Sequence, residues 1–225
     1  MPRLAFLLDV DNTLLDNDHV KQIWSESLDA QVGPKLAASF WDIYEQVRRE
    51  EDVVDIPLAL TRFREETPLT TMDEMTYLHV CALFDDFPFA QELFPHALET
   101  LHYLGTLGLT VILSDGDLYF QAKKISHSGL SEMVEGRILL YVHKQEHLDE
   151  IMSMYAADHY VMVDDKPRIL ADTKAILGNR LTTVFVQQGK YSKEPPPEHF
   201  VPDITLARIG DLRHYGVEQF LHPQQ

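Results

Sequence analysis

The sequence has 225 residues, enough for one substantial hydrophobic core with room for a subdomain. Its formal net charge of −17 argues against nucleic acid as a partner, because a phosphate polymer would be repelled, but a small anionic substrate could still bind a locally positive or metal-containing site. No apolar run approaches the ~18–20 residues that cross a bilayer, so we expect no membrane partner. The single cysteine, Cys81, excludes an intrachain disulfide framework and favours a cytoplasmic location.

The first predicted strand is the apolar run 4–8, whose continuous hydrophobicity is typical of a strand buried on both faces of a parallel sheet. Asp9 and Asp11 follow this strand directly. In open α/β sheets, ligands bind at this end of the strands. Aspartate is rarely buried unpaired, so these two carboxylates need cations, hydrogen bonds or a metal.

The segment 16–89 has apolar residues at helical spacing and no strand-like alternation. We predict four helices in it, at about 19–30, 35–51, 55–66 and 71–84. An insertion after the first strand would stand over the strand ends, where it could close on a ligand and exclude water. We therefore assign 1–15 and 90–225 to a core and 16–89 to an all-helical cap.

Strands and helices alternate from residue 90 onward, which indicates βαβ units. The expected fold class is therefore α/β: a Rossmann-like three-layer core with a mostly parallel sheet, carrying the inserted helical cap. The predicted strands are 109–113, 137–142, 159–163, 181–186 and a short edge strand at 203–206. The predicted helices are about 94–104, 118–126, 145–155, 168–177 and 209–221.

Polar clusters end three of the predicted strands, and a parallel sheet brings them to one edge. Several carboxylates converging there would repel one another and raise their pKa values unless positive charge is present. Mg²⁺, which takes oxygen ligands and keeps waters, resolves this conflict, and a lysine after the third strand would add positive charge. The residues concerned are Asp9, Asp11 and Thr13, then Ser114 and Asp115, then Lys144, then Asp164 and Asp165.

In this order, the clusters resemble the four motifs of the haloacid dehalogenase-like (HAD) hydrolase superfamily. Residues 9–13 resemble the aspartate nucleophile motif, and Ser114 ends a hydrophobic strand as in the second motif. Lys144 and the pair Asp164-Asp165 match the third and fourth motifs. The helical insertion resembles the C1-type cap of the family, so the resemblance covers about residues 4–210.

The resemblance implies a role for each residue. Asp9 would be the nucleophile that forms an aspartyl-phosphate, and Asp11 the general acid and then base. Lys144 would hold Asp9 and offset charge on the phosphoryl group, which Ser114 would bind. The resemblance also implies that Thr13 and Asp115 contact the substrate. The implied Mg²⁺ ligands are Asp9, the backbone carbonyl of Asp11, Asp164 and Asp165. Of the last two, Asp165 is the preferred direct ligand.

Asp11 narrows the choice among the reactions of the family. A phosphate ester needs an acid to protonate its leaving group, whereas a halide ion leaves unprotonated. The dehalogenases of the family lack this second aspartate. The resemblance thus implies a Mg²⁺-dependent phosphatase for a small phosphorylated metabolite. The alternatives are a 2-haloacid dehalogenase, a phosphomutase, a non-catalytic binding module, or a phosphonate hydrolase, which would need a cap lysine (Lys21 or Lys35) for a Schiff base. The substrate and the oligomeric state stay open.

Several other conspicuous residues are expected to have structural roles. The mid-helix position of Lys123 and Lys124, ahead of the third strand, argues against a place in the site. Cap arginines could meet an anionic substrate or lie on a solvated face, and cap aromatics are expected to pack the cap. The arginines are Arg48, Arg49, Arg62 and Arg64; the aromatics are Trp24, Phe40, Trp41 and Tyr44.

Overall fold

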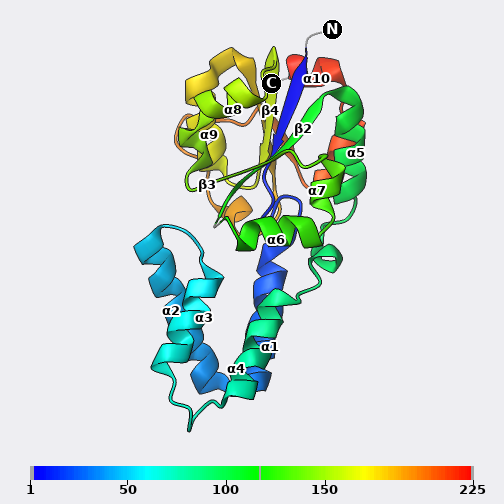
Figure 1. The fold of residues 1–225 in the computed structure, drawn as a ribbon. Helices are drawn as coiled ribbons and strands as arrows, with labels where there is room; N and C mark the ends of the chain where they lie inside the picture. Colours follow the sequence, from blue (N-terminus) through cyan, green and yellow to red (C-terminus); the bar gives the residue numbers. More distant parts are fainter. Residues whose placement is uncertain (1–2, 117, 224–225) are drawn as a thin grey trace.

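A parallel six-stranded sheet forms the centre of the molecule in the computed structural model, which describes residues 3–116 and 118–223 (Figure 1). The strand order β3-β2-β1-β4-β5-β6 is that of a doubly wound α/β fold. This confirms the predicted fold class. The strands are β1 Leu4–Leu8, β2 Leu109–Asp115, β3 Ile138–Tyr141, β4 His159–Asp164, β5 Leu181–Val186 and β6 Ile204–Leu206.

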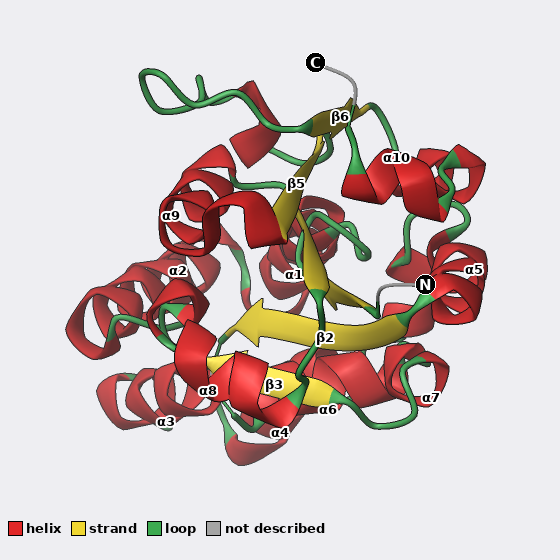
Figure 2. Ribbon diagram, turned by 90° about the horizontal axis from the view of Figure 1, so that it is seen from above, coloured by secondary structure: helices red, strands yellow, loops and turns green. Residues whose placement is uncertain are grey.

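Strand β1 is buried along its whole length because helices cover both of its faces. Phe6 belongs to the core on the side of α5 (Ala97–Leu107) and α10 (Val217–Leu221), where its ring lies 5.2 Å from that of Phe220. Ala5 and Leu7 face the opposite core, under α8 (Leu148–Met154) and α9 (Pro167–Leu177) (Figure 2). The continuous apolar run at 4–8 follows from this double burial.

Four helices occupy the segment between β1 and α5, beyond the carboxyl ends of the strands (Figure 1). Asp16, Asp55 and Asp73 cap three of them by accepting bonds from backbone N–H groups. The aromatics predicted to pack these helices lie in their interior, with Phe40 5.5 Å from Phe63, but Trp24 and Tyr44 also line the pocket described below. The helices are α1 Asn17–Val32, α2 Pro34–Glu51, α3 Ile56–Glu66 and α4 Glu74–Asp85.

Two predicted helices are interrupted. The helix predicted at 209–221 is a 3₁₀ turn, Ile209–His214, followed by α10, because Tyr215 and Gly216 adopt extended backbone between them. The helix predicted at 145–155 begins as a separate 3₁₀ turn, Lys144–Glu146, before α8. The remaining elements are α6 Phe120–His127, α7 Leu130–Met133 and the 3₁₀ turns Phe89–Glu92, Gly178–Arg180 and Tyr191–Lys193. Within the described ranges, none of the helices has both the length and the apolar character needed to span a membrane.

Candidate active site

The loop after β1 holds Asp9 in a fixed position beside β4. The Asp9 backbone N–H donates to Val163 O at 3.0 Å, which extends the β1–β4 pairing by one residue. The Thr13 hydroxyl donates to Asp9 Oδ2 at 3.3 Å, so Thr13 contacts the nucleophile candidate. Asn12 has a φ of 62° and accepts a bond from the Asp18 backbone at 3.1 Å, which ties the loop to the start of α1.

Lys144 lies fully buried between two carboxylates. Its Nζ is 2.5 Å from Asp9 Oδ1 and 2.7 Å from Asp164 Oδ2, and it also donates to Leu113 O at 3.2 Å. Burial alone would lower the pKa of Lys144, but the charges of Asp164 and Asp9 raise it well above its usual value. The side chain is therefore an ammonium at neutral pH. Its backbone N–H donates to Asp115 Oδ1 at 2.8 Å, which fixes the 3₁₀ turn that directs it inward.

Asp9, Asp164 and Asp165 form a buried acidic cluster, with one oxygen of each within 4.8 Å of the others. Asp165 is 0% exposed, and neither of its oxygens has a hydrogen-bond partner among the described residues. Burial, followed by repulsion from Asp164 and Asp9, raises the pKa of Asp165 to about 9. Burial also raises the pKa of Asp9, although Lys144 opposes the shift.

The cluster fits a hard divalent cation such as Mg²⁺. Three carboxylates supply oxygen ligands, and the two oxygens of Asp165 have no other partner among the residues described. Asp164 is already engaged, because its Oδ1 accepts from the Lys166 backbone at 2.8 Å and its Oδ2 faces Lys144. This difference favours Asp165 as a direct ligand.

The carboxylate of Asp11 lies outside this cluster and faces Lys124. Asp11 Oδ1 accepts from Lys124 Nζ at 2.7 Å, and the same Nζ donates to Asn17 Oδ1 at 3.1 Å. Burial would raise the pKa of Asp11, but Lys124, together with Lys166 and Gln121, outweighs burial and the pKa is lowered. The prediction that Lys124 has no place in the site is wrong, because α6 carries it to the mouth of the sheet. The spacing of Gln121 and Lys124 puts both on one helix face, but it does not indicate which way that face points.

Ser114 and Asp115 lie at the end of β2, next to this arrangement. The Ser114 hydroxyl is buried and accepts from Gln121 Nε2 at 3.0 Å. Asp115 accepts from the Lys144 backbone and lines the pocket described next. The structure thus brings all the residues of the four predicted motifs to the carboxyl edge of β1, β2 and β4.

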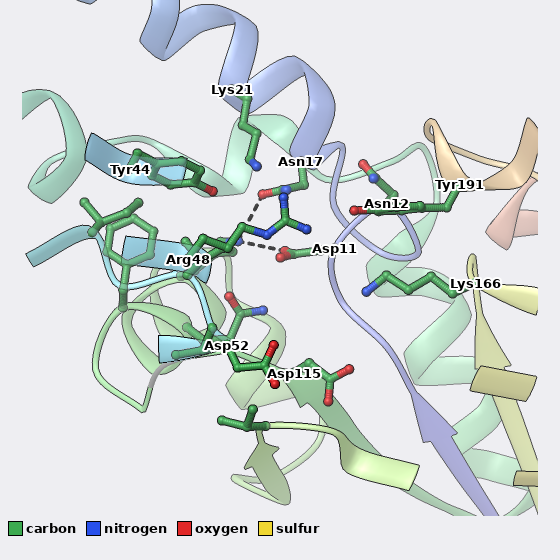
Figure 3. A pocket seen from close by; sticks show the side chains of 18 of the residues that line it. Asp11, Asn12, Asn17, Lys21, Tyr44, Arg48, Asp52, Asp115, Lys166 and Tyr191 are labelled. Atoms are coloured by element: carbon green, nitrogen blue, oxygen red, sulfur yellow. Dashed lines mark hydrogen bonds and ion pairs between the residues drawn. The ribbon is translucent and has the colours of Figure 1, made fainter. Parts of the chain in front are cut away.

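A pocket of about 230 Å³ opens between the cap helices and this edge (Figure 3). Asp9 is 3% exposed and lies outside its lining, whereas Asp11 is exposed into it. Sequence reasoning missed several residues of the core-side wall, among them Lys166, Lys190 and Tyr191. Burial would lower the pKa of Lys166, but Asp9 and Asp164 raise it above its usual value. The position of Lys166, directly after the acidic pair, is the signal that could have identified it.

Gly189 lies against the loop after β1, where there is no room for a side chain. It has a φ of +67°, and a Cβ there would lie 2.4 Å from Asn12 Cβ. We expect Gly189→Ala to destabilise the protein by more than the ~1–2 kcal/mol of the left-handed backbone alone, as measured by urea unfolding. The control is Gly136→Ala, which has a φ of +73° and no heavy atom within 4 Å of the added Cβ. Equal losses of unfolding free energy in the two variants would show that the contact with Asn12 is unimportant.

The chain is similar to known hydrolases in sequence and in fold. The model of the haloacid dehalogenase-like hydrolase family matches residues 4–171. A protein of Burkholderia xenovorans LB400 described as a haloacid dehalogenase-like hydrolase is 46% identical, with a TM-score of 0.86 over 97% of this chain and 98% of that chain. The comparison with curated proteins gave no match.

More distant structures share the fold alone. The HAD-hydrolase YfnB of Bacillus subtilis, bound to magnesium, is 16% identical, with a TM-score of 0.62 over 95% of this chain and 98% of that chain. An L-2-haloacid dehalogenase of Xanthobacter autotrophicus with chloropropionic acid covalently bound is 12% identical, with a TM-score of 0.59 over the same shares. Since the family model covers most of the chain and agrees with the geometry of the site, the chain belongs to the haloacid dehalogenase-like hydrolases.

Proposed function

We propose that this hydrolase is a Mg²⁺-dependent phosphatase that acts on a small phosphate monoester through an aspartyl-phosphate on Asp9. The observation that carries the proposal is Asp11, a carboxylate exposed into the pocket two residues after the buried nucleophile candidate. A phosphate ester needs a proton on its leaving oxygen, and in this proposal Asp11 supplies it; the bound anionic substrate must then raise the pKa of Asp11, which Lys124 lowers in the free protein. We also propose that residues 16–89 form a cap over this site and that the protein is cytoplasmic.

In the first step, a carboxylate oxygen of Asp9 attacks phosphorus, the ester P–O bond breaks, and the leaving oxygen takes a proton from Asp11. In the second step, Asp11 takes a proton from the water that attacks the aspartyl-phosphate, so that phosphate and free Asp9 result. Lys144 holds Asp9 and offsets charge on the phosphoryl group, and Lys124 fixes the carboxylate of Asp11. Mg²⁺ held by Asp9, Asp164 and Asp165 would supply further charge neutralisation.

We expect Asp11→Asn to slow hydrolysis of an alkyl phosphate, which has a poor leaving group, by about 10²–10⁴-fold. With p-nitrophenyl phosphate, whose leaving group needs no acid, the same variant should release about one equivalent of nitrophenol in a burst and then stall, because the second step lacks its base. Stopped-flow absorbance and phosphate release measure the two steps. Asp9→Asn should show neither burst nor turnover, and Asp42→Asn, an exposed aspartate on α2, should behave as wild type.

Equal slowing of both esters by Asp11→Asn without a burst would contradict the acid–base role. Halide release from a 2-haloacid, tested in parallel, would support the dehalogenase alternative instead. The position of Asp11 favours the phosphatase.

Phosphonate hydrolysis is the second candidate, because Lys21 lines the pocket. Burial, with repulsion from Lys190 and Arg48, lowers the pKa of Lys21 to about 8, which increases the amine form that a Schiff base requires. Lys35 is exposed at the start of α2 and has no place in the pocket. Borohydride trapping with a phosphonoaldehyde, in wild type and Lys21→Met, distinguishes this reaction from ester hydrolysis.

A further inference from the structure

The pocket of this acidic protein is lined by a group of cations that the proposed phosphoryl site leaves unused. Lys124 pairs with Asp11, and Lys166 faces the acidic cluster. The other three come from two cap helices and from the loop after β5, and each lines the same pocket. They are Lys21 on α1, Arg48 on α2 and Lys190.

Two of these cations lie over tyrosine rings, and the third interacts with a tyrosine hydroxyl. Lys21 Nζ is 5.0 Å from the centre of the Tyr44 ring, and Lys190 Nζ is 4.9 Å from that of Tyr191. Arg48 interacts with the hydroxyl of Tyr191 and lies 3.5 Å from Glu45. In the described part of the chain, no carboxylate lies within 4.0 Å of the ammonium group of Lys21 or Lys190.

The three cations repel one another. Repulsion from Lys190 and Arg48 adds to burial in lowering the pKa of Lys21. The chain carries a net charge of −17, yet among the described residues the pocket lining holds five lysines and arginines against three aspartates, Asp11, Asp52 and Asp115. A positive concavity between aromatic walls favours an anionic ligand, which would relieve the repulsion among the cations.

The arrangement also indicates which part of the ligand carries that charge. Figure 3 shows Lys21 and Arg48 entering the pocket from the cap side and Lys166 from the core side, with Asp11 between them. The phosphoryl group would lie near Asp9 and Lys144, and Asp11 would face the leaving oxygen. Lys21 and Arg48 from the cap side, together with Lys190 from the core side, would then meet the leaving group beyond that oxygen.

We propose that Lys21, Arg48 and Lys190 form a second anion subsite, so that the substrate is a small phosphate monoester whose leaving group carries a carboxylate or a second phosphate. This inference rests on the proposed phosphatase function and names its substrate class. The pocket volume of about 230 Å³ restricts the ligand to a small molecule.

Three esters with the same three-carbon chain test the subsite: 3-hydroxypropyl phosphate, 3-phosphooxypropanoate and propane-1,3-diyl bisphosphate. We expect kcat/KM for at least one anionic ester to exceed that for the hydroxyl ester by roughly tenfold or more, the size of one charge-assisted hydrogen bond. The two anionic esters show whether the tail is a carboxylate or a phosphate. Arg48→Met should lower the ratio of kcat/KM for the preferred anionic ester to kcat/KM for the hydroxyl ester by about tenfold. Arg49→Met, which changes the adjacent exposed arginine, should preserve this ratio.

Each ratio compares two esters on the same variant, so a loss of folded protein lowers both kcat/KM values equally and cancels. The test therefore works even if Arg48→Met is less stable than the wild type. Equal kcat/KM values for all three esters would overturn the subsite while the phosphatase proposal stands. If no ester is hydrolysed, the phosphatase proposal fails, and calorimetric binding of the three esters to Asp9→Asn then decides the subsite. Tighter binding of an anionic ester by about tenfold would support it, and equal binding would overturn it.

Discussion

Lys144→Met is expected to destabilise the metal-free protein by about 3–5 kcal/mol and to abolish phosphate release, because it leaves buried carboxylates without their cation. Lys144 has no solvent-exposed side-chain surface and lies within 2.7 Å of both Asp9 and Asp164. Methionine keeps the length of the side chain, so the change removes charge more than volume. Urea unfolding at pH 7 measures the free energy, and phosphate release measures the activity.

The matched control is Lys123→Met, which removes a cation from the more exposed ion pair with Asp85, 2.7 Å long. We expect this variant to lose less than ~1 kcal/mol, because solvent screens such pairs. The double variant Asp164→Asn/Lys144→Met should recover part of the loss, since one of the uncompensated charges is gone. A loss below about 1 kcal/mol for Lys144→Met would show that the ammonium is not what allows Asp9 and Asp164 to lie together.

Mg²⁺ is expected to stabilise the wild-type protein, by about 2.7 kcal/mol at a concentration one hundred times its Kd, and Asp165→Asn should remove most of this gain. Both oxygens of Asp165 are buried and have no partner among the described residues, so a bound cation would supply the missing interaction. Thermal unfolding in Mg²⁺ and in EDTA measures the effect without any substrate. Asp149→Asn, an exposed aspartate at the start of α8, is the control and should keep the full gain.

Asp165 should also make the stability of the metal-free protein depend on pH. Its pKa is about 9 in the folded protein and about 3.9 in an unfolded chain, so the folded state binds the extra proton between these values. The stability contributed by this proton is fully present below pH ~4 and is lost as the pH rises toward about 9. Asp165→Asn should flatten that decline. A variant that keeps both the decline and the Mg²⁺ gain would place the cation elsewhere.

The parts of the site that follow strand ends could be predicted from the sequence. Asp9, Ser114 and Asp164 each end or follow a hydrophobic run, and the rule that parallel strands share one carboxyl edge brings them together. The expectation that a cation binds there followed from the number of carboxylates at that edge. These inferences need only the order of elements and the direction of the strands.

The parts of the site that come from helices could not be predicted in the same way. Lys124 reaches Asp11 only because α6 crosses the mouth of the sheet, and Arg48 enters the pocket only because α2 turns one face toward the core. Both orientations depend on tertiary packing, which the spacing of apolar residues does not specify. The break in the last predicted helix is local instead: the Gly216 N–H bonds to the side chain of Gln219, so that Gly216 caps the start of α10.

The central position of β1 has a consequence for the order in which the chain folds during synthesis. Its two neighbours, β2 and β4, begin at residues 109 and 159, whereas α1 to α4 contact one another within residues 17–85. Local helical contacts form faster than strand pairings of such long range. The helices can therefore fold on the emerging chain while β1 waits for its partners, and Asp9 gains Val163 and Asp164 beside it only after β4 has been made. Until then, a strand that is wholly buried in the native state is exposed to association with other chains.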